Sequence, residues 1–237
     1  MNYSSARTLA SLAGAGTLAV LAAIAFLYQL PSTFFPYSGG PLGLDLFALL
    51  LFYLAYAAIS FPFDVWAGYS VPCRYLGECD LFPLYLGRLV RGIAAQGLVM
   101  IASAAAILVG GRLWGTAGAA SAFVLALCAT ALARPYLHRY LSTRPAPPAT
   151  PRAWSLAIAW NLAGFALSVS LPWCGVATTY SLLETLLGCS LWSLLGLAIL
   201  PRIDRQAASL ALYLSWASFG LLSRATAEPA GRPERWA

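Results

Sequence analysis

Six long apolar stretches dominate this sequence and constrain its fold more than any other feature. They cover residues 8–30, 42–61, 84–109, 115–133, 153–171 and 178–200. A helix of about 20 apolar residues matches the hydrocarbon thickness of a bilayer. Inside a bilayer, only helices and closed barrels satisfy every backbone polar group. The sequence therefore predicts an all-α fold, a polytopic transmembrane bundle of six or seven helices.

The seventh candidate helix is a shorter apolar stretch at 207–222. Its length of about 16 residues is below the usual length of a membrane span. It either crosses the membrane or lies on the surface as an amphipathic helix, and we expect it to cross. Residues 1–222 would then form a single transmembrane domain, and the polar tail at 223–237 is expected to be disordered.

The composition supports a membrane protein and indicates how it is oriented. Of the 237 residues, 60% are hydrophobic and 9% are charged, whereas a soluble domain has about 25% charged residues. All 14 basic residues are arginine. They lie at the ends of the apolar stretches and not on one polar face, so the net charge does not indicate nucleic acid as a partner. Ten of them share one side if the N-terminus is cytoplasmic, which predicts that orientation in a bacterial inner membrane.

The connecting segments differ in character. Residues 31–41 predict an aromatic-rich turn on the outer side, and residues 63–83, after an interruption at Pro62, predict a polar loop at the interface. Residues 134–152 are basic and rich in proline, which predicts an extended linker. The stretch at 115–133 is rich in Ala and Gly, so we expect its helix to be central in the bundle.

Five cysteines indicate the redox setting. Cys73 and Cys79 share one loop, which the arginine distribution places in the cytoplasm, so we expect free thiols there. Cys128 and Cys189 lie inside apolar stretches, where a buried, small apolar side chain is expected. No histidine accompanies Cys73 and Cys79, so a zinc site is not predicted.

Glu184 is the one acidic residue well inside an apolar stretch, which makes it a candidate functional residue. A structural interpretation is also open: an uncharged Glu184 hydrogen-bonded to Asn161, or to a hydroxyl such as that of Thr185, would hold two helices together. The alternative is that Glu184 handles protons or substrate.

Asp64 is a second candidate, because it follows an apolar stretch and two arginines lie one helical turn apart in the next stretch. These arginines are Arg88 and Arg91. An ion pair of Asp64 with either of them would fix how the two spans dock. The alternative is that Asp64, Arg88 and Arg91 contact a substrate.

Several kinds of catalytic chemistry are not favoured. His138 is the only histidine, which excludes a zinc-binding pair of histidines on one helix. Ser190 lies in the middle of a stretch and His138 at the end of another, too far apart for a nucleophile and its base. No lysine is present, and no phosphate-binding or dinucleotide-binding motif occurs. We therefore predict no catalytic residue, no metal and no cofactor.

Four short motifs between residues 60 and 88 carry a family resemblance: Ser60-Phe61-Pro62-Phe63-Asp64, Gly68-Tyr69, Arg74-Tyr75-Leu76-Gly77 and Leu86-Gly87-Arg88. They resemble the membrane region of the CAAX-prenyl-protease-like zinc metallopeptidases, in which a Pro-Phe pair ends one span and an aromatic, basic loop leads to the next. The resemblance extends over about residues 45–205. It implies a membrane shell without the protease, because the family's metal-binding His and Glu residues are not present here.

Three functions follow from these observations. We expect a non-catalytic membrane protein, an accessory or scaffold subunit whose partners are the lipid bilayer and other membrane proteins. The first alternative is an enzyme acting on lipid or lipidated substrates at the cytoplasmic face with Asp64, Glu78, Asp80, Arg88 and Arg91. The second is a small transporter whose path is lined by Glu184, Asn161 and Gln96.

Overall fold

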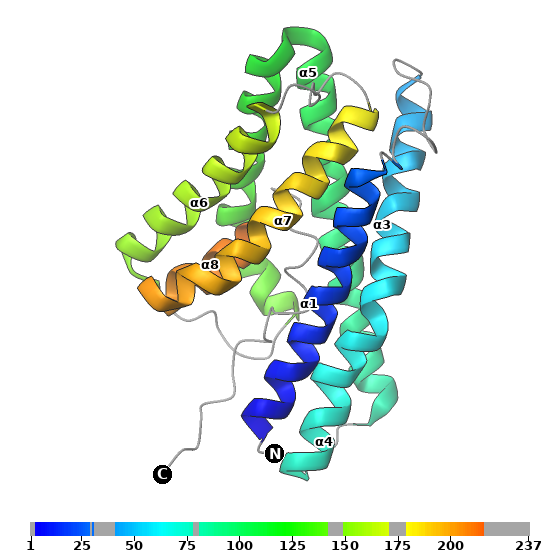
Figure 1. The fold of residues 1–237 in the computed structure, drawn as a ribbon, viewed down its shortest axis with the longest axis vertical. Helices are drawn as coiled ribbons and strands as arrows, with labels where there is room; N and C mark the ends of the chain where they lie inside the picture. The colour runs from blue at the N-terminus through cyan, green and yellow to red at the C-terminus, as the bar shows by residue number, and fades with distance from the viewer. Residues whose placement is uncertain are drawn as a thin grey trace.

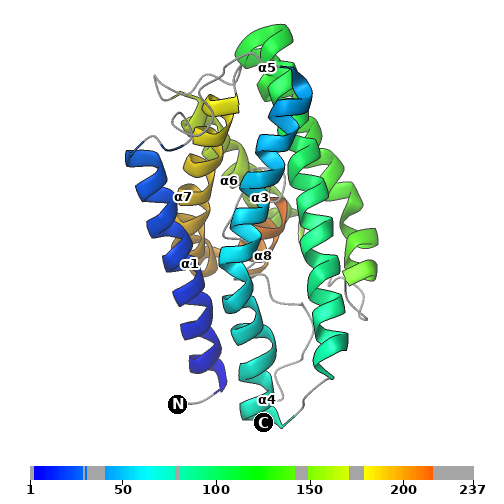
Figure 2. The same cartoon turned by 90° about the vertical axis from the view of Figure 1, so that its right-hand side faces the viewer.

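The computed structural model describes residues 3–28, 30, 41–77, 81–141, 149–170 and 179–215, and within these ranges it contains helices and no strand. Helices α1, α3 and α5 run roughly along one long axis, and α6, α7 and α8 are inclined across it (Figures 1 and 2). The predicted all-α bundle is confirmed, while the predicted tail at 223–237 lies outside the described residues. The elements are α1 (Tyr3–Leu27), α3 (Leu42–Val65), η1 (Trp66–Ser70), α4 (Val71–Leu76), α5 (Phe82–Leu141), α6 (Pro151–Ser170), α7 (Thr179–Ile203) and α8 (Arg205–Leu214).

Four helical stretches are long and apolar enough to cross a membrane, namely Leu42–Tyr75, Phe82–Tyr136, Pro151–Ser170 and Ser181–Ile203. The outer faces of these helices expose large apolar side chains, such as Leu98 and Leu132 of α5, which are 73% and 76% exposed. Water-soluble proteins rarely expose contiguous apolar surface on this scale, whereas lipid covers it. The chain is a helical membrane protein.

Helix α5 is a hairpin of two antiparallel arms. Trp114 (φ −133°) and Gly115 (φ 63°, ψ −148°) leave the helical conformation, and the chain turns back on itself there (Figure 2). The positive φ of Gly115 is one that L side chains rarely adopt. A Cβ atom on Gly118 would lie 2.2 Å from the carbonyl oxygen of Gly110, so the two arms touch backbone to backbone. The arms correspond to the spans predicted at 84–109 and 115–133.

The central helix is α7 and not the Ala- and Gly-rich second arm of α5, so that expectation was wrong. All seven residues at 181–187 are buried, whereas more than half of the second arm is exposed. Helix α7 packs against α1, α6 and α8. The small residues of the second arm allow its backbone to lie close to the first arm of the same hairpin.

Two predicted connections are helical, which corrects the sequence interpretation. The expected loop after Pro62 continues as helix through η1, a π-helical turn, and α4 as far as Leu76. Helix α5 likewise runs past Pro135 to Leu141, so the basic linker begins later than expected. A proline is tolerated in such helices because a π turn can reorganise the freed backbone groups, and leaving the helix in lipid would expose more of them.

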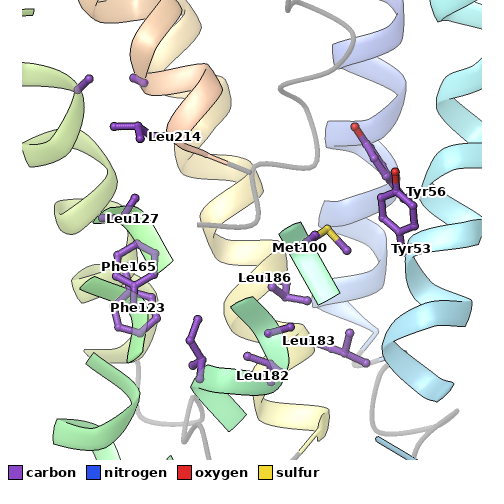
Figure 3. Close-up of a cluster of buried hydrophobic side chains, with 14 of the residues drawn as sticks. Tyr53, Tyr56, Met100, Phe123, Leu127, Phe165, Leu182, Leu183, Leu186 and Leu214 are labelled. Atoms are coloured by element: carbon purple, nitrogen blue, oxygen red, sulfur yellow. The ribbon is translucent and has the colours of Figure 1, made fainter. Parts of the chain in front are cut away.

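A hydrophobic core joins α5, α6 and α7 (Figure 3). The rings of Phe123 and Phe165 stack with their centroids 4.1 Å apart, and Leu182, Leu183 and Leu186 are fully buried. Helix α8 packs against α6 and α7 (Figure 1). Its ten residues span about 15 Å, half of a bilayer's hydrocarbon thickness. Residues 216–222 lie outside the described residues, so the expected crossing of 207–222 stays a prediction.

The two ends of the bundle differ in charge. Nine of the ten arginines in the described part of the chain lie in the half of the bundle that holds the N-terminus and α4, and we refer to this half as the arginine-rich end. It also includes the end of α7 and the start of α8, which lie farther from the N-terminus along the long axis (Figure 1). The tenth arginine, Arg112, lies at the opposite end beside the turn of the α5 hairpin. The Arg134 guanidinium lies 5.6 Å from the centroid of the Trp154 ring, which anchors the α5–α6 connection at the arginine-rich end.

Candidate functional site

Glu184 lies in the second turn of α7, on the most enclosed part of the central helix. Its side chain is 2% exposed. The neighbouring hydroxyl of Thr185 is also buried and donates to the carbonyl oxygen of Ser181 over 2.9 Å. This bond stays within α7, so the Thr185 hydroxyl donates to the backbone of its own helix and not to a neighbouring helix. A carboxyl group at this depth is costly when charged, and Glu184 therefore remains a candidate functional residue.

Asn161 holds α8 against α6. Its Nδ2 atom donates to the carbonyl oxygen of Ala157 over 2.9 Å and to that of Ala211 over 3.1 Å. Ala211 lies in the last turn of α8, and its carbonyl oxygen also accepts from the backbone N–H of Ser215. The Tyr213 hydroxyl, which donates to the Thr130 carbonyl oxygen over 2.8 Å, ties α8 to α5 as well. Asn161 therefore serves as a packing residue that fixes the end of α8.

The packing of α6 against α7 separates Asn161 from Glu184. Gly164 lies against the ring of Trp192, and Gly188 lies against Ser168, so residue 161 is level with about residue 195 of α7. At about 1.5 Å per residue, Glu184 is roughly 16 Å farther along the helix. The two side chains are therefore not hydrogen-bonded to each other, whereas a hydrogen bond of Glu184 to a nearby hydroxyl stays a prediction.

A stacked pair of tryptophans lies at this α6–α7 contact. The Trp160 and Trp192 rings have centroids 4.6 Å apart, and the Trp192 indole donates to the carbonyl oxygen of Trp160 over 2.9 Å. A Cβ atom on Gly196 would lie 2.7 Å from Trp160. Glycines thus make room for two large rings, which fixes the register of the two helices.

Gln96 is buried on the first arm of α5, beside a tyrosine contact with α3. It is 1% exposed. The next residue, Gly97, leaves room for the ring of Tyr53, and the Tyr53 hydroxyl donates to the carbonyl oxygen of Ile93. Gln96, Asn161 and Glu184 thus lie on α5, α6 and α7, and a common path between them stays a prediction.

Asp64 ends α3 at the arginine-rich end and is 8% exposed. Its backbone carbonyl oxygen accepts a hydrogen bond of 2.8 Å from the Tyr85 hydroxyl of α5. Arg88 and Arg91 follow Tyr85 on the same helix and are exposed. The structure thus places the end of α3 against Tyr85 of α5. An ion pair of Asp64 with Arg88 or Arg91, or a substrate site formed by the three, stays a prediction. Glu78 and Asp80 lie outside the described residues, so the convergence required for an enzyme stays a prediction.

An ion pair that the sequence did not reveal ties the opposite end of the bundle together. The guanidinium of Arg112 donates to the carboxylate of Asp45 over 2.6 Å, and the two side chains are 24% and 5% exposed. Asp45 lies in the first turn of α3, and Arg112 lies in the last turn before the break in α5. Each charge therefore also complements the dipole of its own helix. Their separation of 67 residues hides the pair in the sequence.

The cysteines differ from expectation at two positions. Cys73 is disulfide-bonded, so the predicted free thiol was wrong, and its partner lies outside the described residues. Cys189 is free and buried as expected, whereas Cys128 is free but exposed on α5.

The described residues contain no group of three His, Cys, Asp or Glu side chains arranged to hold a metal ion. Ser190 is buried in α7 and donates to the carbonyl oxygen of Leu186 over 2.9 Å, while His138 falls in the final turns of α5. Comparisons of the chain with protein-family models, with curated proteins and with solved structures found no match.

Proposed function

We propose that this chain is a non-catalytic, multi-pass membrane protein that acts as an accessory or scaffold subunit of a membrane complex. The proposal includes the resemblance to the membrane region of CAAX-prenyl-protease-like metallopeptidases. The chain would then be a membrane shell that lacks the catalytic part of those proteases. We place it in a bacterial inner membrane, in contact with lipid and with other membrane proteins.

The use of buried polar side chains in helix packing is the observation that supports this proposal most. Ser168, Thr185, Ser190 and Ser193 each donate to a backbone carbonyl of their own helix. Asn161 joins α6 to α8. A catalytic centre needs several reactive groups aimed at one point, whereas these groups face the backbone.

Replacing Glu184 tests the scaffold role against the transporter alternative. If Glu184 is structural and uncharged, Glu184→Gln preserves its shape and polarity, and the variant should fold with a thermal stability close to that of the original chain. Glu184→Lys should abolish folding, because a fixed charge at this depth costs a few kcal/mol. Stability is measured by thermal unfolding in detergent.

Proton flux into liposomes containing each protein, followed with a pH-sensitive dye, supplies the second measurement. The scaffold role predicts the same flux for the original chain and for Glu184→Gln. A flux in the original chain that Glu184→Gln removes would support the transporter and contradict our proposal.

We propose that the arginine-rich end faces the cytoplasm, with the N-terminus on that side. The proposal rests on nine of the ten arginines in the described ranges lying at this end. The disulfide of Cys73 lies at the same end, and a disulfide persists in an oxidising compartment. The disulfide therefore favours the opposite orientation, and labelling of the two ends of the bundle decides between them.

Two ends of one helical arm supply a matched test of this orientation. Leu81 and Trp114 flank the first arm of α5 and are 71% and 73% exposed. In a background without other cysteines, we expect a membrane-impermeant maleimide to label Trp114→Cys in intact spheroplasts and Leu81→Cys only after lysis. The reverse labelling pattern would show that the arginine-rich end faces outward, which agrees with the disulfide of Cys73.

A further inference from the structure

A cavity of about 230 Å³ opens at the arginine-rich end, between the start of α1 and the η1–α4 segment. Helix α1 supplies Ala6 and Leu9 to its wall. One stripe of the η1–α4 segment supplies the other side, and its polar members are Trp66, Ser70, Arg74 and Tyr75. The cavity thus has one apolar wall and one polar wall.

Every polar side chain in this wall can donate a hydrogen bond, and none is acidic. The Arg74 guanidinium and the Trp66 indole are donors only, while the hydroxyls of Ser70 and Tyr75 both donate and accept. Within the described ranges, no carboxylate pairs with Arg74. The cavity is therefore complementary to an anionic group with several acceptor oxygens, and a guanidinium matches the geometry of phosphate especially well.

The polar wall is held in place from behind. A Cβ atom on Gly68 would lie 2.5 Å from the Tyr85 hydroxyl, so η1 lies directly against that ring. The same hydroxyl bonds the Asp64 carbonyl oxygen, and the Tyr69 ring lies 5.3 Å from the Tyr85 ring. A π-helical turn inside a helix often marks a functional site, and here it forms the wall that carries Ser70.

The surroundings of the cavity are those of a membrane interface. Trp66 and Tyr75 are 41% and 37% exposed at its edge, and these residue types are enriched where headgroups meet the acyl chains. Leu9 and Leu12 lie three residues apart on α1, and both are exposed. An acyl chain can follow this apolar face while its headgroup occupies the cavity.

We propose that this cavity binds the phosphate headgroup of an anionic phospholipid, with the Arg74 guanidinium as the main contact. Trp66, Ser70 and Tyr75 donate further hydrogen bonds, and the acyl chains lie along the exposed face of α1. A positively charged headgroup amine finds no acidic side chain in the wall and meets Arg74. The site therefore favours a phosphatidylglycerol-like lipid over a zwitterionic one.

Delipidated protein in detergent is titrated with phosphatidylglycerol or with phosphatidylcholine of the same acyl chains, and bound lipid is counted by native mass spectrometry. Loss of one charge-assisted phosphate contact corresponds to roughly a tenfold loss of affinity. Arg74→Gln should therefore bind phosphatidylglycerol about tenfold more weakly. Arg202→Gln, at the exposed end of α7, removes the same charge outside the cavity and should leave this affinity unchanged.

Ser70→Glu supplies a second variant with Arg74 in place. The introduced carboxylate would lie four residues before Arg74, which is the favourable order for an ion pair on a helix. The variant should therefore fold, and its carboxylate should pair with the Arg74 guanidinium in place of the lipid phosphate. The Ser70→Glu variant should bind phosphatidylglycerol as weakly as the Arg74→Gln variant does.

Four outcomes would overturn the proposal. The first is equal affinity for the two lipids, and the second is an unchanged affinity in Arg74→Gln or in Ser70→Glu. The third is an equal loss of affinity in Arg202→Gln. The fourth is displacement of phosphatidylglycerol by an equal concentration of inorganic phosphate, which would identify a site for soluble phosphate and not for lipid.

Discussion

Gly118→Ala should destabilise the bundle by about 3 kcal/mol, at the upper end of the usual cost of overpacking. The new Cβ atom would lie 2.2 Å from the Gly110 carbonyl oxygen and 2.8 Å from the Cβ atom of Trp114. Backbone atoms cannot rotate away as a flexible side chain can, so the two arms of α5 must separate. Gly118→Leu should prevent folding of the hairpin altogether. The free energy of unfolding is measured by steric trapping in bicelles.

Gly92→Ala is the matched control for this prediction. Gly92 lies on the first arm of α5, and a Cβ atom there would meet nothing within 4 Å. Replacing an unobstructed helical glycine by alanine gains up to about 1 kcal/mol of helix propensity. The same substitution should thus have opposite signs at positions 92 and 118. Equal effects at both positions would show that the two arms do not touch at Gly118.

Removal of one partner from the Asp45–Arg112 ion pair should also lower the free energy of unfolding substantially. Asp45→Asn leaves the guanidinium without its carboxylate and should cost about 2–3 kcal/mol, less than a fully buried pair because the Arg112 side chain is 24% exposed. Arg112→Gln should cost a similar amount. The double variant should lose less than the sum of the two, with a coupling energy of about 1–2 kcal/mol.

The exchanged pair, Asp45→Arg with Arg112→Asp, separates the ion pair from the helix dipoles. The exchange restores opposite charges but places each against the dipole of its helix, so we expect only partial recovery of stability. Additive losses in the double variant would show that the two side chains do not interact in the folded protein.

The sequence predicted the helices well because bilayer thickness constrains their length directly. Spans at 42–61 and 153–171 correspond to α3 and α6, and the all-α bundle follows from the lack of water inside a membrane. Helix ends were predicted less well. Pro62 was interpreted as a break, and the basic linker was expected to begin at residue 134. A helix in lipid instead continues through a proline when leaving it would expose more polar backbone.

The arrangement of the helices was harder to predict, because small residues indicate close contact but not with which partner. Gly110 and Gly118 meet within one hairpin, so the Ala- and Gly-rich arm is peripheral and α7 is central. Among the candidate site residues, Asp64 contacts α5 through Tyr85, a few residues before Arg88 and Arg91. Asn161 and Glu184 are separated by the register of α6 against α7. That register depends on the stacking of Trp160 and Trp192, which no local pattern reveals.

The scaffold role is tested most directly by the composition of the native particle. The chain, tagged and expressed at its natural level, is extracted into lipid nanodiscs and purified, and the mass and metal content of the particle are measured. Our account predicts a particle that contains a second membrane polypeptide in fixed proportion. A particle that contains this chain alone, or one zinc ion per chain together with peptidase activity, would contradict it.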